Sequence, residues 1–199
     1  MDRSGLQRLV PIFLVCIVIV LAVAALVSLG RTLFGGSTQV EAPVNSGMQE
    51  LTSTLADRSV RMSVRGPIVA RENYYTYKIT ISPDARNMTT YHGYLGDEAE
   101  SMQMQNDAQA YGQFVHALAY ANMMNGVPLS KEADDTTGIC ASGYLYEFEV
   151  RQGDNSVQRL WTTTCGGSPG SLKANLSQVV GLFRQQIPEY SELLRKINF

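Results

Sequence analysis

The stretch "GICASGYLYEFEVRQGDNSVQRLWTTTCGG", residues 138–167, contains two of the three cysteines of this 199-residue chain. From Tyr144 onward, aromatic and aliphatic residues alternate with polar ones, which predicts a strand with one buried face. The turn residue Gly153 separates this run from a second one. The stretch therefore predicts a β-hairpin, and Cys140 and Cys165 flank its open end.

The spacing of the two cysteines also predicts how the hairpin pairs. If Cys140 lies opposite Cys165, then Tyr144 lies opposite Trp161 and apolar residues face apolar residues along most of the ladder. We expect a disulfide bond, because an even pair of cysteines in a domain outside the cytosol is typical of one. Loop-closure entropy gives such a bond about 3–4 kcal/mol at most. The alternative is two free buried thiols in a cytosolic domain.

A long apolar segment precedes this domain. Residues 10–30 contain no charged side chain and are long enough to cross the hydrocarbon core of a bilayer as a helix. Arg3 and Arg8 come before the segment and Arg31 follows it, a slight bias that favours a cytoplasmic N-terminus formed by residues 1–9. We expect an uncleaved signal anchor, a single-pass transmembrane helix whose partner is the lipid bilayer. A cleaved signal peptide is the alternative.

The rest of the chain predicts one α+β domain. Residues 31–45 are expected to be a linker, and residues 46–199 an extracytoplasmic domain. The apolar patterns predict an antiparallel sheet of about five strands, covered by two or three helices and stapled by one disulfide bond. The expected strands and helices include residues 59–66, 73–82, 88–95 and 108–124. Asn106 and Ser171 are expected to begin two helices as N-caps, and Gly126 to end the first of them.

The sequence shows no catalytic constellation. His92 and His116 are the only histidines, and no metal-ligand spacing, phosphate-binding loop or nucleophile elbow is present. We therefore expect no catalytic residues, no metal and no cofactor, and the net charge of -2 argues against nucleic acid as a partner. Glu147 and Glu149 share one strand face, as a carboxylate pair in a glycoside-processing enzyme would. Plain solubilising residues are the alternative.

The tyrosines form the candidate binding surface. Ten tyrosines are more than the core of a small domain needs. Tyr74, Tyr91, Tyr94 and Tyr120 are expected to point outward, where aromatic side chains suit an envelope protein or a glycan. The alternative is that these rings cover hydrophobic faces with their hydroxyl groups in water.

Three segments carry a family resemblance: "VRGPIVARENYYTYKITISPDARNMTTYHGYLG", "AYGQFVHALAYANM" and "CASGYLYEF…LWTTTCG". They resemble segments of single-span, membrane-anchored exported proteins of Saccharibacteria and related candidate-phyla bacteria, over most of residues 58–187. No activity is attached to that group. The resemblance therefore implies only a bacterial cell envelope location, a membrane anchor and an architecture.

These observations together predict a membrane-tethered extracytoplasmic domain with a non-enzymatic role in binding or envelope assembly. One alternative is a cell-wall or glycan-processing enzyme, and another is a structural subunit of a larger envelope complex. The sequence alone does not identify the ligand.

Overall fold

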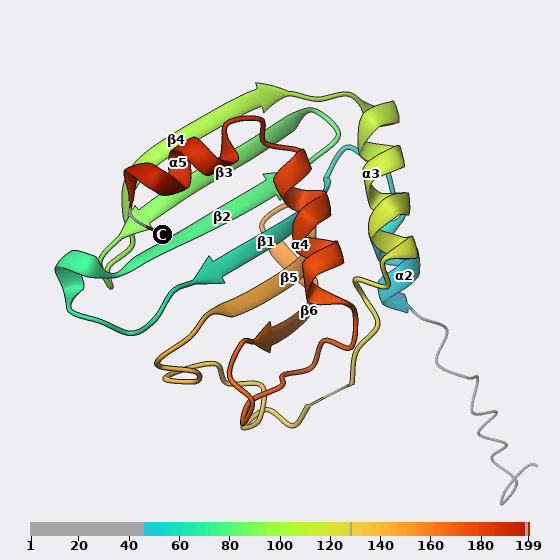
Figure 1. The fold of residues 1–199 in the computed structure, drawn as a ribbon. Helices are drawn as coiled ribbons and strands as arrows, with labels where there is room; N and C mark the ends of the chain where they lie inside the picture. Colours follow the sequence, from blue (N-terminus) through green and yellow to red (C-terminus); the bar gives the residue numbers. More distant parts are fainter. Residues whose placement is uncertain (1–45, 128, 198) are drawn as a thin grey trace, which may run out of the picture. The chain divides into compact units, whose positions relative to one another are not determined.

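The computed structural model describes residues 46–127, 129–197 and 199. They form an α+β fold in which one six-stranded antiparallel sheet has the strand order β4-β3-β2-β1-β5-β6 (Figure 1). The α+β class, the antiparallel sheet and the disulfide bond are therefore confirmed. The strands are β1 (Arg58–Arg65), β2 (Tyr75–Ile81), β3 (Ala85–His92), β4 (Asp97–Gln105), β5 (Leu145–Gln152) and β6 (Asn155–Thr163). The helices are α2 (Ser46–Leu51), α3 (Ala108–Tyr120), α4 (Leu176–Gln185) and α5 (Tyr190–Lys196), with a short 3-10 turn, η1 (Arg71–Asn73).

The expected signal anchor and linker, residues 10–30 and 31–45, lie outside the described residues. No helix within the described part of the chain is long and apolar enough to span a membrane.

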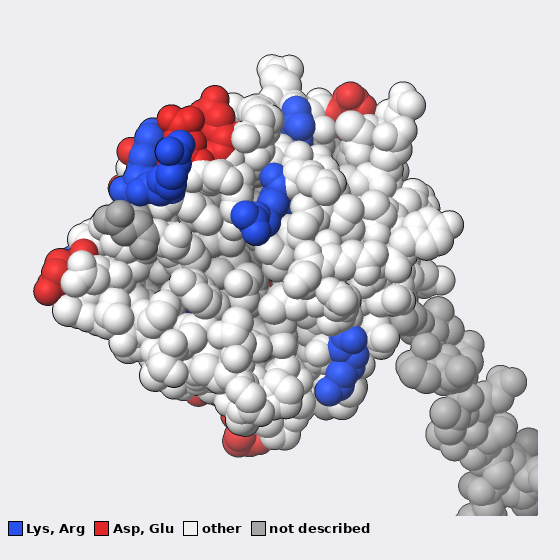
Figure 2. Space-filling view, in the orientation of Figure 1, with Lys and Arg blue, Asp and Glu red and all other residues white. Residues whose placement is uncertain are grey.

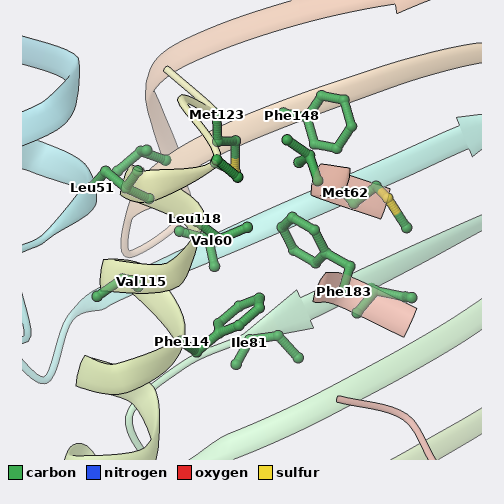
Figure 3. Packing of buried hydrophobic residues seen from close by; sticks show 14 of the residues in the cluster. Leu51, Val60, Met62, Ile81, Phe114, Val115, Leu118, Met123, Phe148 and Phe183 are labelled. Carbon is green, nitrogen blue, oxygen red and sulfur yellow. The ribbon is translucent and has the colours of Figure 1, made fainter. Parts of the chain in front are cut away.

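The helices lie on one face of the sheet, and the core fills the space between them. Figure 1 shows α4 and α5 crossing in front of the strands, with α3 beside them. Phe183 of α4 packs edge-to-face on Phe114 of α3, with ring centroids 5.3 Å apart, and also contacts Phe148 of β5. Figure 3 shows the rings of Phe148 and Phe183 near the side chain of Met62 from β1, and Phe114 beside Ile81. Aromatic and aliphatic burial on this face is the main source of stability.

The sheet has one strand more than the expected number of about five. β4, with the sequence DEAESMQMQ, was missed because acidic residues fill its first half and suppress its β-pattern. Only Met102 and Met104 alternate with polar residues, and both pack partly buried against the core. An edge strand with charged residues is a recurrent device against uncontrolled strand pairing.

The expected register of the β5–β6 hairpin was wrong. Trp161 pairs with Glu147 instead of Tyr144, and Leu145 pairs with Thr163. The reason is that Cys140 precedes the strand: it lies in a loop with a positive φ of 55°, and β5 begins only at Leu145. The bond between the cysteines therefore joins two loops instead of two paired strand residues.

Two helix boundaries also differ from expectation. The helix α3 begins after Asp107, not Asn106, and the Asp107 side chain accepts a hydrogen bond from the amide of Ala110. It ends near Asn122, whose φ of 57° is the left-handed conformation that closes helices. Gly126 is not the stop, since it forms an isolated bridge with Leu172.

Ser171 was also wrongly expected to cap a helix. The N-cap of α4 is Asn175, whose Oδ1 accepts a hydrogen bond from the amide of Gln178 at 3.1 Å. Ser171 instead lies along the outer edge of β6, where its hydroxyl accepts a hydrogen bond from the amide of Trp161 at 3.0 Å. The amide of Leu172 donates to the carbonyl of Trp161 at 2.9 Å, so this segment covers the edge of β6.

Candidate ligand-binding site

The second face of the sheet carries most of the polar chemistry of the domain. Alternate residues of β1, β2 and β5 point away from the helices, and they include Arg61, Arg65, Lys78 and Glu149. Figure 2 shows the opposite face, over α4 and α5, where charged side chains occupy only a few patches. We call the polar side the open face, because none of the described helices packs on it in Figure 1.

A covering segment, residues 129–142, lies over the β5–β6 part of the open face. Asp134 receives two side chains of β6: Arg159 at 3.1 Å and the indole nitrogen of Trp161 at 2.8 Å. The Thr136 hydroxyl donates to Glu147 at 3.4 Å. These contacts bury Trp161, which is only 2% exposed although it faces away from the main core.

The disulfide bond fixes the end of the covering segment. Cys140 and Cys165 are bonded, with their Cα atoms 5.5 Å apart. Gly143 lies against the bond so closely that a Cβ there would be 2.8 Å from the Cys140 sulfur. The amide of Tyr144 then donates to the Thr164 hydroxyl at 2.9 Å. The start of β5 is thus held to the end of β6 by covalent and polar contacts together.

A hollow of about 200 Å³ lies beside the covering segment, between β1, β2 and β5. Its polar lining comes from both the sheet and the segment. The residues that line it include Ser63, Arg65, Tyr74, Thr76, Lys78, Thr136 and Glu147. The size suits a small group of a ligand better than a whole drug-sized molecule.

Two cations of the hollow have no carboxylate partner among the residues that the structure describes. Arg65 donates to the carbonyl oxygens of Thr136, at 3.3 Å, and Ile139. Its Nε atom is buried without a hydrogen-bond partner in the described structure. Lys78 holds its ammonium group 4.9 Å from the ring centre of Tyr91. Carbonyl groups and an aromatic face orient these charges but do not neutralise them.

The two carboxylates that β5 places on this face, in contrast, are paired. Glu147 accepts hydrogen bonds from Arg159 at 3.2 Å and 2.5 Å. Glu149 lies 3.7 Å from Arg61 and 3.5 Å from Arg151. Arginine side chains therefore balance the charges of both carboxylates.

The four candidate tyrosines do not form one surface. Tyr74 was wrongly expected to point outward: it is buried, lines the hollow and stacks on Tyr94 with ring centroids 4.2 Å apart. Burial raises the pKa of Tyr74, and the nearby charge of Arg65 partly opposes this shift. Tyr91 lies half-buried on the open face beside Lys78.

Tyr94 and Tyr120 are exposed as expected, at 52% and 88%. Tyr120 belongs to α3, which lies on the helix-covered side, so it is separate from the other three (Figure 1). Tyr94 instead joins an apolar tip at the end of the sheet, where its hydroxyl donates to the carbonyl of Val69 at 2.5 Å. Val69 is 42% exposed and Leu95 is 77% exposed.

The sequence alone did not identify the hollow. The alternation of apolar and polar residues placed Arg65 and Lys78 on solvent-facing sides of their strands. It did not show that β1 and β2 are neighbours, with Ser63 opposite Lys78. Thr136 belongs to a polar loop without a period, so nothing in the sequence assigned it to the same place.

Comparisons with known proteins give no family for this chain. No protein-family model matches it, and no curated protein matches its sequence. Within residues 46–127, 129–197 and 199, no group of three or more histidine, cysteine, aspartate or glutamate residues could hold a metal ion. His92 contacts the carbonyl of Glu72 at 3.1 Å and the ring of Tyr75.

Proposed function

We propose that the chain is a membrane-tethered module of the bacterial cell envelope, which presents this domain outside the membrane and binds a partner at the tyrosine-bearing end of the open face. The observation that carries the proposal is the meeting of the hollow with the stacked pair Tyr74 and Tyr94. The location rests on the apolar segment 10–30 and on the disulfide bond, which is typical of oxidising compartments.

The composition of this end favours binding. Tyr94, Leu95 and Val69 expose apolar area together, while the strands of the open face carry polar and charged side chains. Aromatic side chains beside a polar rim are typical of interaction sites, because a ring buries a large area with little loss of conformational entropy. The surface therefore suits an envelope glycan or protein.

A glycan-processing enzyme is less well supported. A general acid must donate a proton to the leaving group. Glu147 and Glu149 are instead held in ion pairs with Arg159, Arg61 and Arg151, so neither side chain is free to approach a leaving group. Changing both glutamates to glutamine and assaying peptidoglycan fragments tests this alternative, which requires that activity be present and be lost in the double variant.

Site-specific crosslinking in the native cells tests the proposal. A photoreactive amino acid replaces Tyr94 at the tip, and a matched control replaces Gln178, an exposed residue of α4 on the other face. We expect adducts from position 94 and none from position 178. Protease added to intact cells is expected to remove the C-terminal domain.

Two results would contradict the proposal. Equal adducts from both positions, or none from position 94, would show that the tip is not a specific contact surface. A C-terminal domain that is degraded only after cell lysis would contradict the location.

A further inference from the structure

We propose that the hollow binds an oxyanion, a carboxylate or phosphate group, and that Arg65 and Lys78 supply the charge that attracts it. This names the ligand chemistry of the site and so rests on the proposed function, although purified protein can test it separately. Four observations carry the inference: strand pairing, charge balance, hydroxyl groups and the neighbouring aromatic stack.

Strand pairing places the two cations at a distance that one oxyanion can bridge. Arg65 pairs with Thr76, and Ser63 pairs with Lys78, on adjacent antiparallel strands. Arg65 and Lys78 are therefore diagonal neighbours on the open face, and such neighbours lie about 7–8 Å apart, with their Cβ atoms somewhat closer. Long cationic side chains at this separation can both reach a group that lies between them.

The residues that line the hollow carry a net positive charge. Its lining contains two cations and one carboxylate, that of Glu147. One oxygen of this carboxylate already receives hydrogen bonds from Arg159 and Thr136, so its charge is compensated from the side of β6. Since the charges of Arg65 and Lys78 are not compensated by any described carboxylate, an incoming anion gains from both.

Hydroxyl groups complete the donor set. Ser63 and Thr76 lie on the open face beside the two cations and line the same hollow. A hydroxyl group can donate one hydrogen bond to an oxyanion, and hydrogen bonds between a neutral donor and a charged acceptor are among the stronger ones in proteins. The hollow therefore offers both charge and direction to a small oxyanion.

The stacked tyrosines indicate where the rest of the ligand lies. Tyr74 forms part of the lining, and Tyr94 covers its ring at the tip of the domain. An oxyanion bound at Arg65 would leave the remainder of its molecule beside Tyr94 and Leu95, which are exposed. An envelope polymer with an acidic group fits this arrangement, because the acidic group can lie at Arg65 and the rest of the polymer beside Tyr94 and Leu95.

The test uses the full chain in a zwitterionic detergent and the small anions themselves. Inorganic phosphate and acetate are titrated separately at low ionic strength and followed by the NMR amide shifts, with chloride at equal ionic strength as reference. We expect saturable shifts in residues 63–65 and 76–78. Saturation by phosphate alone, acetate alone or both supports an oxyanion site and identifies its preferred group.

Variants locate the binding. Lys78→Gln is expected to weaken it about tenfold or more, and Lys78→Arg to retain most of it. Lys173→Gln, which removes an exposed lysine outside the hollow, is the matched control and is expected to change nothing. Arg65→Gln is a second variant, whose fold is checked by the amide spectrum because Arg65 also holds the covering segment.

Three outcomes would overturn the inference: no saturable shift with either anion, shifts equal to those in chloride, or equal weakening by Lys78→Gln and Lys173→Gln. These outcomes are separate from those of the crosslinking experiment. Anion binding without adducts at position 94 would leave the oxyanion site standing and reject the envelope partner. Adducts at position 94 without anion binding would reject the oxyanion site and leave the envelope partner standing.

Discussion

Trp161 donates its indole hydrogen to Asp134 at 2.8 Å, and this contact joins the only tryptophan of the chain to the segment that covers it. The fluorescence of the protein therefore reports on the covering segment. The core on the other face of the sheet contains none of the residues 129–142, so we expect that loosening the segment leaves the core of the domain folded.

The first prediction concerns this contact. Asp134→Ala leaves the indole N–H of Trp161 without its acceptor and removes an ion pair of Arg159. We expect tryptophan emission to shift to longer wavelength and stability to fall by about 1–3 kcal/mol. Far-UV circular dichroism is expected to stay unchanged. Glu132→Ala, an exposed acidic residue of the same segment, is the control, and an equal emission shift in both variants would contradict the role of Asp134.

The second prediction concerns the disulfide bond. Replacing Cys140 and Cys165 together by serine removes a link across 25 residues, which costs about 3.5 kcal/mol by loop-closure entropy. We expect the sheet to persist, while the covering segment becomes cleavable by trypsin at Lys131 and Trp161 becomes exposed to quenchers. A variant with native resistance to trypsin and native quenching would show that the polar contacts alone hold the segment.

The third prediction concerns high pH. Burial raises the pKa of Tyr111 to about 12, from an ordinary value of 10.0. Because the folded state favours the protonated phenol, this stabilisation is complete below pH 10 and is lost as the pH rises through 12. We expect Tyr111→Phe to move the alkaline unfolding transition to higher pH, as followed by circular dichroism. Tyr120→Phe, at an exposed site of the same helix, is expected not to move it.

The fourth prediction uses two glycines with the same backbone conformation. Gly170 and Gly138 have φ values of 72° and 71°. A Cβ at Gly170 would lie 2.3 Å from the carbonyl oxygen of Trp161, whereas a Cβ at Gly138 meets no described atom within 4 Å. Alanine at Gly138 should cost about 1–2 kcal/mol through backbone strain, and alanine at Gly170 about 1–3 kcal/mol more through overlap. Chemical denaturation measures both, and equal losses would contradict the close packing at β6.

Much of the fold could be predicted from local patterns. Alternation identified β1, β2 and β5, and the helical spacing of Tyr111 and Phe114 identified the buried side of α3, because burial of one face imposes a period on a regular element. β4 was not predicted, because the sequence of an edge strand with little burial shows almost no alternation of apolar and polar residues. The register of the hairpin was not predicted correctly because Cys140 lies in a loop before β5, and alternation does not show where the strand begins.

The candidate site was less predictable, since its residues come together only through the sheet topology. Arg65 and Lys78 lie on strands joined by a connection that includes η1, and Thr136 reaches them from a segment far along the chain. The tyrosines at the tip were expected to bind, but the buried position of Tyr74 follows from its stacking on Tyr94. No local pattern gives such a contact.

The two margins of the sheet differ in a way that limits self-association. Ser171 and Leu172 occupy the outer side of β6, whereas β4 ends the sheet on its other side with no further described strand. If the β4 strands of two copies paired with each other, the open edge of β4 would be paired in both copies. Such growth stops at a closed pair instead of continuing into a fibre.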